Sequence, residues 1–401
     1  MNVLVVCPRL PYPPDNGGAI RIYSLLRELA RRHRVALLCY GTPSGEAARA
    51  LGFLDEVRAV PAPRFPRPFA AHARALPSAL PASVCYPAEP LAGHLRSLTA
   101  GRRFDIVQFE FLGVAHLASA LAGRPRRVLV NHCIVSELRA RQLRLMPWGP
   151  RRVYYALDLP KVRRFERAAV RASDGCVAVS ARDAQQLRAW APASPVAVIP
   201  NGVDTAYFRP VGREDPRELL FIGSFDQDEA NADAVLYFAR EILPRIRRRV
   251  ADVHVTVVGS GPPPAVRGLG HTPGIEVLGR VCDVRPYLAR AATLVLPLRG
   301  GAGTKVRVFT AMAMQKPVLT TPLGTEGVQA APGEEIVVAD GPDAFAEEAV
   351  ALLLDPERRA RIGRAARARA VAEYDWRVLG RRLEAFHAAL LDGARAAVGG
   401  G

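Results

Sequence analysis

Short runs of apolar residues recur along the first half of the chain, separated by stretches with a helical repeat of apolar positions. The run Val3–Cys7 precedes the stretch 20–31, whose apolar side chains fall on one helical face. Runs of this length are typical of strands buried on both faces, and strands that alternate with helices form parallel sheets. The same pattern predicts further strands at 34–40, 55–61, 104–109, 127–131 and 175–180.

A second series of the same kind begins near residue 218. Its predicted strands are 218–222, 253–258, 275–278, 293–297, 317–320 and 335–338. Its predicted helices are about 229–249, 283–290, 304–314, 342–353 and 356–371, and a last helix covers 376–392. Because 401 residues exceed one ordinary core, the two series predict two Rossmann-like α/β domains, each with a doubly wound parallel sheet.

Turn-forming residues and prolines concentrate between the two series, in Ile199-Pro200-Asn201-Gly202-Val203-Asp204 and in the residues after it. We therefore expect a first domain over 1–200, a linker over 201–217, a second domain over 218–375, and a last helix with a flexible tail over 376–401. The proline-rich segment 65–90 predicts an irregular loop. The stretch 151–171 predicts one long basic helix, interpreted first as a solvated face.

The net charge of +17 leaves three interpretations open. Only Lys161, Lys305 and Lys316 are lysines among 55 basic residues, so the excess is mostly arginine and is typical of a coding bias. A site for a phosphorylated substrate and adhesion to an anionic membrane are the alternatives. The basic residues are spread along the chain and no nucleic-acid-binding motif is visible, so we expect no nucleic-acid partner.

The cysteines and histidines favour neither disulfides nor a metal. The six cysteines form no Cys-x-x-Cys pair and predict reduced, buried side chains in a cytoplasmic protein. The eight histidines lack ligand spacing, so we expect no metal site. The first residues predict a strand rather than a signal peptide, and no apolar run is long enough to span a membrane, so membrane contact would be peripheral.

Two glycine-rich loops follow predicted strands, where doubly wound sheets bind ligands. In Asp15-Asn16-Gly17-Gly18, bare backbone at the start of a helix suits an anion, and Asp15 either caps the helix or binds a sugar hydroxyl. In Val258-Gly259-Ser260-Gly261-Pro262, a border for a nucleotide base and a simple tight turn are equally good interpretations.

A third loop, Arg299-Gly300-Gly301-Ala302-Gly303-Thr304-Lys305, lies between a strand and a helix. Its amides and the helix dipole suit a pyrophosphate, and the compact ammonium of Lys305 suits one phosphate oxygen. The spacing is not that of a Walker A loop, so ATP hydrolysis is not indicated. We predict a phosphate site here in preference to a structural turn.

Several single residues also fall at predicted strand ends. His132 follows the strand 127–131, and Glu110 is a weaker candidate at the end of 104–109. Gly324-Thr325-Glu326-Gly327 would bring a carboxylate or backbone amides to the same edge. Arg280 and Asp283 flank a strand-to-helix turn, where an ion pair or a helix cap is the simplest interpretation.

The combination of motifs resembles glycosyltransferase family 4, in the branch of bacterial sugar transferases with the GT-B fold. The matching motifs span nearly the whole chain: Pro11-Tyr12-Pro13-Pro14-Asp15-Asn16-Gly17-Gly18, Arg21, Phe165-Glu166, Val179-Ser180, Ile199-Pro200-Asn201-Gly202-Val203-Asp204, Phe221-Ile222-Gly223-Ser224, Val258-Gly259, Val277-Leu278-Gly279-Arg280-Val281, Pro297-Leu298 with the third loop, Ala311-Met312-Ala313-Met314, Lys316-Pro317-Val318 and Gly324-Thr325-Glu326-Gly327.

The resemblance implies two domains that face a cleft, with a UDP-, GDP- or TDP-linked sugar on the second domain and a glycan, lipid-linked or small-molecule acceptor on the first. It implies transfer with retention of configuration, without a metal or other cofactor, and a last helix that returns to the first domain. By analogy, Gly17 and Gly18 lie beside the donor phosphates, His132 near the reacting sugar and Lys305 on the pyrophosphate, with Arg299 helping to stabilise the leaving group.

The sequence departs from the family pattern at the donor site. Thr310 stands where the family usually carries a glutamate that holds the ribose, and Ala302 stands at the companion acidic position. The usual Gly-Arg and Lys-Gly pair is replaced by Gly223-Ser224-Phe225-Asp226. A non-catalytic relative that acts as a binding or partner subunit is therefore the alternative hypothesis. A sugar epimerase or a phosphorylase is a third, and the usual pyridoxal lysine of a phosphorylase is not evident.

Overall fold

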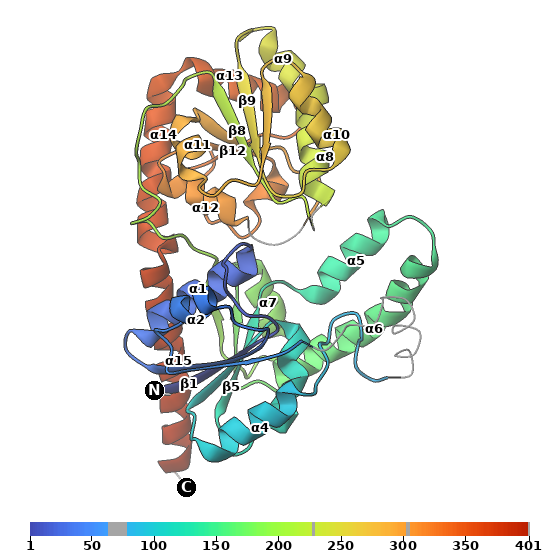
Figure 1. Ribbon diagram of the computed structural model, residues 1–401, viewed down its shortest axis with the longest axis vertical. Coiled ribbons are helices and arrows are strands. Elements are labelled where there is room, and N and C mark those ends of the chain that lie inside the picture. Colours follow the sequence, from blue (N-terminus) through green and yellow to red (C-terminus); the bar gives the residue numbers. More distant parts are fainter. Residues whose placement is uncertain (63–77, 227–228, 302–304, 400–401) are drawn as a thin grey trace. The chain divides into compact units, whose positions relative to one another are not determined.

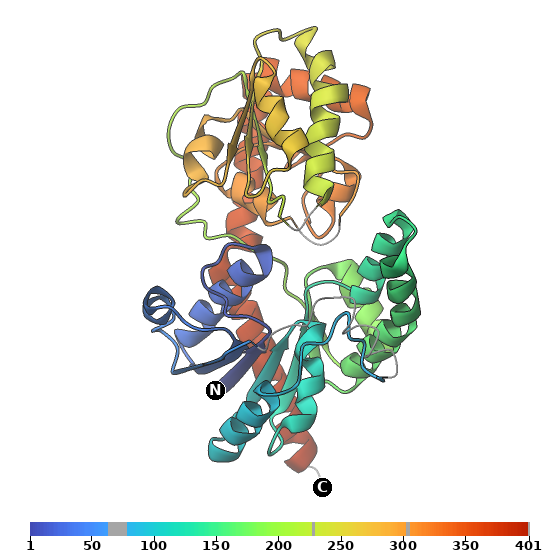
Figure 2. The same cartoon turned by 45° about the vertical axis from the view of Figure 1, so that its right-hand side comes forward.

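The computed structural model describes residues 1–62, 78–226, 229–301 and 305–399. The chain divides into two compact units. Unit 1 comprises Met1–Ile199 and Leu379–Gly401, and unit 2 comprises Pro200–Val378. Residues 201–217, the expected linker, therefore belong to unit 2 by their contacts. Helices lie on both faces of the sheet in each unit (Figures 1 and 2).

Unit 1 contains a seven-stranded parallel sheet in the order β3-β2-β1-β4-β5-β6-β7. The strands are β1 (Asn2–Cys7), β2 (Arg34–Tyr40), β3 (Glu56–Val60), β4 (Ile106–Glu110), β5 (Arg126–Asn131), β6 (Gly175–Ala178) and β7 (Val196–Val198). The helices are α1 (Gly17–Ala30), α2 (Gly45–Ala50), α4 (Leu91–Gly101), η1 (Leu112–Ala120), α5 (Val135–Leu145), α6 (Pro150–Arg171), α7 (Ala181–Trp190) and α15 (Trp376–Gly399).

Unit 2 contains a six-stranded parallel sheet in the order β10-β9-β8-β11-β12-β13. The strands are β8 (Glu218–Ile222), β9 (His254–Val258), β10 (Ile275–Gly279), β11 (Thr293–Leu296), β12 (Val318–Thr320) and β13 (Val337–Val338). The helices are α8 (Glu229–Tyr237), η2 (Phe238–Ile242), α9 (Leu243–Arg247), α10 (Pro264–Arg267), η3 (Gly268–His271), α11 (Arg285–Arg290), α12 (Val306–Ala313), η4 (Pro322–Thr325), α13 (Pro342–Leu354), α14 (Pro356–Arg369) and η5 (Ala370–Tyr374).

Both sheets reverse their winding direction at one place. In unit 1 the order runs outward from β1 to β3 on one side and from β4 to β7 on the other, so the reversal falls between β1 and β4. In unit 2 the corresponding reversal falls between β8 and β11. The loops at the carboxyl ends of these strand pairs diverge to opposite faces and leave room for a ligand. The topology therefore fixes where a site is expected in each unit.

The helix α15 packs against α1 and the sheet of unit 1. A Cβ added at Gly380 would lie 2.5 Å from the Cβ of Glu28 on α1. A Cβ added at Gly175 on β6 would lie 2.9 Å from ring and methyl carbons of Phe386 and Leu390. Glycine at these two positions therefore allows α15 to approach closely, and the end of the chain becomes part of the first unit.

Several predictions need correction. The helix expected over 229–249 is divided into α8, a π-helical turn η2 and α9, and Pro244 lies where α9 begins. Proline lacks an amide hydrogen, so the regular bonding pattern cannot continue through it. Of the six cysteines predicted to be buried, Cys282 is exposed, and Cys85 and Cys133 are only half-buried. In the segment 65–90, residues 63–77 lie outside the described ranges, and 78–90 contain neither helix nor strand.

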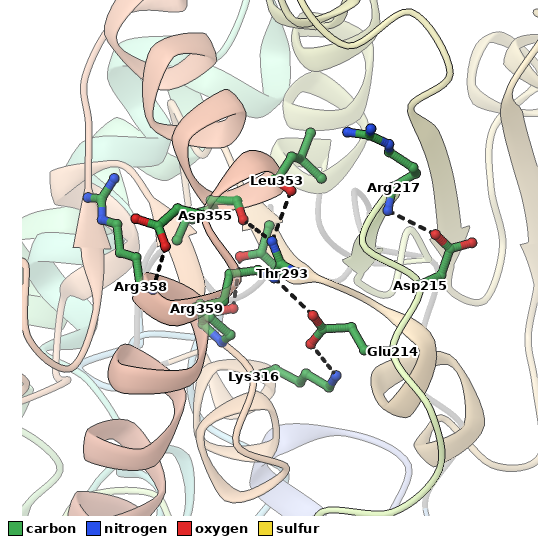
Figure 3. Close-up of polar contacts among 11 residues, drawn as sticks. Glu214, Asp215, Arg217, Thr293, Lys316, Leu353, Asp355, Arg358 and Arg359 are labelled. Carbon is green, nitrogen blue, oxygen red and sulfur yellow. Dashed lines mark hydrogen bonds and ion pairs between the residues drawn. The ribbon is translucent and has the colours of Figure 1, made fainter.

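Glu214 anchors the residues around it to unit 2 (Figure 3). Its Oε1 accepts a hydrogen bond from Nε of Arg359 on α14, and its Oε2 accepts one from Nζ of Lys316, each at 2.9 Å. NH1 of Arg359 also donates to the carbonyl oxygen of Leu353 at 2.9 Å. Both cations are buried. Lys316 is thus occupied by a structural ion pair.

Replacing Glu214 with glutamine should lower the free energy of unfolding by about 2 kcal/mol, because two buried cations then lose their only charged partner among the described ion pairs. Glu348→Gln is the matched control, since Glu348 pairs with Arg358 at the surface and should contribute less than about 1 kcal/mol. Urea denaturation measures both. Equal effects would contradict a structural anchor at Glu214.

Candidate functional site

The first candidate site lies at the reversal point of unit 1. A Cβ added at Gly18, in the first turn of α1, would lie 2.8 Å from Cζ of Phe111, the residue after β4. The Phe111 ring stacks on His132, the residue after β5, with 3.7 Å between ring centroids and 16° between planes. The predicted loop at Gly17 and Gly18 and the predicted His132 therefore belong to one constellation.

Phe111 has an unusual backbone conformation at this point. Its φ of 74° is rare for a residue with a side chain and costs on the order of 1–3 kcal/mol. Such conformations persist where the surroundings impose them, and they are common at functional sites. Here the backbone turns the ring onto His132, which restricts the orientation of the imidazole.

Glu110 holds the other edge of the His132 ring. Its Oε2 lies 2.6 Å from Nε2 of His132, and its Oε1 accepts a 2.6 Å hydrogen bond from Nε2 of Gln108 on the same strand. Glu110 and Gln108 are buried, and so is Arg21 on α1, whose charge also acts on Glu110. The sequence alone makes Glu110 a weaker candidate than His132, but the structure joins the two residues by a direct contact.

Burial sets the protonation of this group. Burial lowers the pKa of His132 below its ordinary value, and the neighbouring Glu110 carboxylate opposes that shift. Burial lowers the pKa of the Arg21 guanidinium to about 10, so Arg21 remains charged at neutral pH. His132 is therefore a neutral imidazole at neutral pH, with one nitrogen held by Glu110.

Asp15 does not cap α1. The helix cap is Asn16, whose side-chain oxygen accepts a 3.0 Å hydrogen bond from the backbone N–H of Ala19. Asn16 also donates to Oδ1 of Asp15 at 3.1 Å. Both residue types are good helix caps, and Asn16 occupies the position directly before the helix. The capping alternative for Asp15 is wrong, and binding of a sugar hydroxyl stays a prediction.

The second candidate site lies at the reversal point of unit 2, where the loops after β8 and β9 pack without room for side chains. A Cβ added at Gly259 would lie 1.6 Å from the carbonyl oxygen of Gly223. Gly261 has a φ of 63°, and a Cβ there would lie 1.8 Å from Oδ1 of Asp226. The Oγ atoms of Ser224 and Ser260 are 3.1 Å apart. The loop 258–262 is thus fixed against 223–226.

Arg307 on α12 connects these loops to the predicted phosphate loop, and sequence reasoning did not single it out. Its NH1 donates to the carbonyl oxygen of Ile222 at 2.6 Å, and its NH2 donates to Oδ1 of Asn231 at 2.7 Å. Nδ2 of Asn231 in turn donates to the carbonyl oxygen of Ser224 at 2.6 Å. In a chain so rich in arginine, no sequence signal separates Arg307 from the others.

The predicted phosphate loop follows β11. Gly300 and Gly301 lie within the described residues, and Gly301 has a φ of 98°. Gly303 and Thr304 lie outside the described residues. Lys305 directly precedes α12 and is half-buried. The structure therefore places Lys305 at a helix N-terminus, as its sequence position predicts.

Arg299 is held by α8. Its Nε and NH2 donate to the two carboxylate oxygens of Asp233 at 3.0 and 2.5 Å, and its guanidinium lies 4.2 Å from the ring centroid of Tyr237. Such a bidentate pair fixes the guanidinium plane. The hydrogen bond from Arg299 to Asp233 raises the pKa of Arg299. Its assignment to the leaving group stays a prediction.

The remaining predicted residues lie on separate elements of unit 2. The hydroxyl of Thr310 donates to the carbonyl oxygen of Arg307 at 2.8 Å, within α12. Thr325 donates to the carbonyl oxygen of Pro322 at 2.8 Å, and Gly327, after the half-buried Glu326, has a φ of 79°.

Arg280 is exposed after β10. Asp283 forms an ion pair with Arg285 at 2.8 Å, and its Oδ1 accepts a 2.9 Å hydrogen bond from the backbone N–H of Arg285, the first residue of α11. The Asp283 carboxylate therefore binds within the turn that precedes α11.

The described residues contain neither a metal-binding cluster nor a helix suited to crossing a bilayer. No group of three or more histidine, cysteine, aspartate or glutamate side chains in those ranges is arranged to hold a metal ion. Across the same ranges, no helix combines the length and the apolar character needed to cross a bilayer.

Comparison with known proteins identifies the family. Residues 15–207 match the family model described as Glycosyltransferase Family 4, and residues 216–355 match the one described as Glycosyl transferases group 1. The two matches together cover most of the chain, with one match largely in each unit. The family resemblance expected from the motifs is confirmed.

Curated relatives with significant similarity include two proteins of Mycobacterium tuberculosis. A phosphatidyl-myo-inositol mannosyltransferase of Mycobacterium tuberculosis is 31% identical over 196 residues, which cover 45% of this chain and 50% of the relative. A glycogen synthase of the same species is 28% identical over 248 residues, 55% of each chain. The chain thus spans about half the length of the curated relatives it matches.

Solved structures with the same architecture cover nearly the whole chain. A sucrose-phosphate synthase from Thermosynechococcus elongatus superposes with a TM-score of 0.74 at 16% identity, covering 98% of this chain and 100% of its own. The Anabaena protein HepE, solved with UDP and glucose, gives 0.69 at 11% identity, covering 96% and 98%. These likenesses and the two parallel sheets show the GT-B fold.

Proposed function

We propose that this protein is a glycosyltransferase that moves a sugar from a nucleotide-sugar donor to a glycan, lipid-linked or small-metabolite acceptor. The donor diphosphate would bind in unit 2, and the reacting sugar would meet His132 of unit 1. Retention of configuration and independence from a metal are further parts of the proposal, and both come from the family resemblance.

One observation carries the proposal. At the reversal point of unit 2, the loops after β8 and β9 pack closely through Gly223 and Gly259. Arg307 on α12 donates to the backbone at the end of β8, and Lys305 directly precedes α12. Backbone amides, a helix N-terminus and a compact cation favour a diphosphate over an uncharged ligand. A nucleoside diphosphate is the leaving group of a nucleotide sugar, so this chemistry suits the proposed reaction.

The division of tasks between the units follows from charge. As the glycosidic bond to the donor breaks, negative charge grows on the diphosphate, and fixed donors at Lys305 and the α12 N-terminus would stabilise it. Positive charge grows at the sugar carbon. The neutral ring of His132 would accept a hydrogen bond from the sugar at Nδ1, while the Glu110 carboxylate adds a favourable field.

A product assay tests the proposal. Purified protein is incubated with UDP-, GDP- and TDP-sugars and with glycan or lipid-linked acceptors, with and without EDTA, and the products are resolved by mass spectrometry. We expect one donor class to give a glycosylated product whose yield EDTA leaves unchanged. Absence of both product and donor binding across the panel would refute the proposal.

An acceptor at an anionic membrane surface fits the exposed face of the hairpin α5–α6. Trp148 in its turn is 83% exposed, and Leu157 and Val153 on α6 are 56% and 45% exposed. Exposed arginines continue near the same face of α6: Arg164 and Arg167. Apolar side chains beside several cations are suited to the interface of an anionic bilayer.

Replacing Trp148 and Leu157 together with alanine should therefore weaken binding to vesicles containing phosphatidylglycerol by about tenfold, since two apolar anchors are lost. Cosedimentation with phosphatidylglycerol and with pure phosphatidylcholine vesicles measures it. Leu354→Ala is the control, because Leu354 is 51% exposed on unit 2. Equal binding by the double variant and wild type would exclude the hairpin, and a change in oligomeric state would indicate a second copy instead.

The alternative is a non-catalytic binding subunit, and Thr310 is the observation that favours it. Its hydroxyl hydrogen is used by the carbonyl oxygen of Arg307, and it offers no charged grip on a ribose. Thr310→Glu should then tighten binding of UDP or GDP by about tenfold, measured by titration calorimetry. Sugar transfer by the wild-type protein would exclude this alternative.

A further inference from the structure

Buried polar side chains connect the last helix of the protein to His132. Nε2 of His387, on α15, lies 3.0 Å from Oε1 of Gln108 on β4. Gln108 donates from its Nε2 to Oε1 of Glu110 at 2.6 Å, and Oε2 of Glu110 lies 2.6 Å from Nε2 of His132. The first contact joins residues 279 positions apart in the chain, and all four side chains belong to unit 1.

The position of these four hydrogen-bonded side chains is unusual. His387, Gln108 and Glu110 are each at most 2% exposed, between the sheet and α15. Polar groups at such a place lower stability unless they are hydrogen-bonded, whereas apolar side chains would pack there without that requirement. Leu383 and Leu390 on the same helix show that apolar packing is available. A series of hydrogen-bonded polar side chains at this place therefore indicates a role beyond packing.

The hydrogen-bond chemistry fixes the direction of each contact. An ionised Glu110 only accepts hydrogen bonds, so Gln108 must turn its NH₂ group to Glu110 and its carbonyl oxygen to His387. That oxygen only accepts, so His387 must carry its proton on Nε2. Burial lowers the pKa of His387 to about 3, which leaves one ring proton at neutral pH. By the same argument, His132 donates from Nε2 to Glu110 and keeps Nδ1 as an acceptor.

We propose that His387 is a positioning residue for His132. By donating to Gln108 it fixes the amide that holds Glu110, and Glu110 then fixes the tautomer and ring orientation of His132. The consequence for catalysis rests on the proposed function, whereas the tautomer is a property of the protein alone.

Loss of the His387 N–H would act in steps. The Gln108 carbonyl would be left buried without its donor, so the Gln108 side chain would no longer be held in one position, and its hydrogen bond to Glu110 would weaken. Glu110 would then rotate away from His132, and both ring tautomers would populate. The other groups that face the chain remain in place: Arg21 from α1 and Cys7 from β1 toward Glu110, and His33 toward His387.

Imidazole ¹⁵N NMR of the intact protein tests the proposal without an activity assay. We expect wild-type His132 to show a single tautomer protonated at Nε2. His387→Leu should give a mixture of tautomers and move the His132 titration to lower pH, because Glu110 then supports the charged ring less. His387→Gln, which keeps an N–H near the same place, should restore the wild-type pattern. An unchanged His132 tautomer and titration in His387→Leu would overturn the proposal.

Steady-state kinetics is the second test of the proposal, and Leu390→Ala is the matched control on the same helix. His387→Leu should lower kcat by about 10-fold to 100-fold with KM for the donor within about twofold, as expected for loss of a positioning contact. Leu390→Ala should lower only the Tm. Equal kcat values for His387→Leu and Leu390→Ala in folded protein would overturn the proposal.

The proposal can still be tested if His387→Leu does not fold or if the wild-type protein is inactive. If His387→Leu does not fold, Gln108→Leu breaks the same chain and should give the same mixture of His132 tautomers, and an unchanged tautomer there would overturn the proposal. If the wild-type protein transfers no sugar, the proposed function fails, while the NMR comparison still decides whether His387 positions His132.

Discussion

Replacing Lys305 with alanine is expected to lower kcat/KM for sugar transfer by about 10²-fold to 10³-fold while changing the free energy of unfolding by less than about 1 kcal/mol. Lys305 directly precedes α12, where backbone amides and a compact ammonium are suited to the same diphosphate. The charge on that group is largest in the transition state, so the loss should fall mainly on kcat. Initial rates at varied donor concentration measure it.

The lysine content of the chain supplies a clean control. Lys161 lies on α6 of unit 1, far in sequence from the donor loops, and Lys161→Ala should change kcat/KM by less than about twofold. Lys316 is unsuitable because it pairs with Glu214. A Lys305→Ala protein with wild-type kinetics would remove Lys305 from the mechanism.

Replacing His132 with alanine is expected to lower kcat by about 10²-fold to 10³-fold, because the reacting sugar would lose its polar contact at the reversal point of unit 1. Glu110 would also lose the donor on its Oε2 and would keep the hydrogen bond from Gln108 on its Oε1. Rates at saturating donor measure the effect. His116→Gln is the control, since His116 is a half-buried histidine of the same unit. Equal losses in both variants would contradict a specific function for His132.

The pH dependence of the same reaction has a defined sign. Burial lowers the pKa of His132, so the ring is neutral at pH 7 and takes a proton only as the pH falls below its ordinary value of about 6.5. We expect kcat to be level above that pH and to fall below it, and His132→Gln to lack this acid limb. The folded state binds the proton less readily than the unfolded state, so the stability contribution is full above about 6.5 and is lost as the pH falls toward the folded pKa. A wild-type profile without an acid limb would contradict a neutral ring.

Much of the fold follows from the alternation of apolar runs and helical repeats. A strand buried on both faces needs a continuous apolar run, so β1 and β8 are evident in sequence. The short edge strand β7 was not predicted, because three half-buried residues carry little pattern. The break of the 229–249 helix depends on how one proline is accommodated by a π-helical turn, which periodicity does not register.

The candidate site is predictable where it depends on strand ends. Gly18 and His132 follow different strands, and parallel strands bring their carboxyl ends to one edge, so their association follows from the fold class. The contact between Gln108 and His387 has no such signal, because it joins residues that only the packing of α15 brings together. Arg307 is likewise indistinguishable from the other arginines until its guanidinium is seen to bind the loop after β8.

The central claim is that unit 2 binds a nucleoside diphosphate, and the thermal unfolding of the intact protein tests it most directly. Ligands that bind only the folded state raise the Tm by mass action. We predict that UDP, GDP or TDP at millimolar concentration raises the Tm by several degrees, and that the matching monophosphate raises it clearly less because it lacks the second phosphate. A Tm that no nucleoside diphosphate or nucleotide sugar changes would contradict the account.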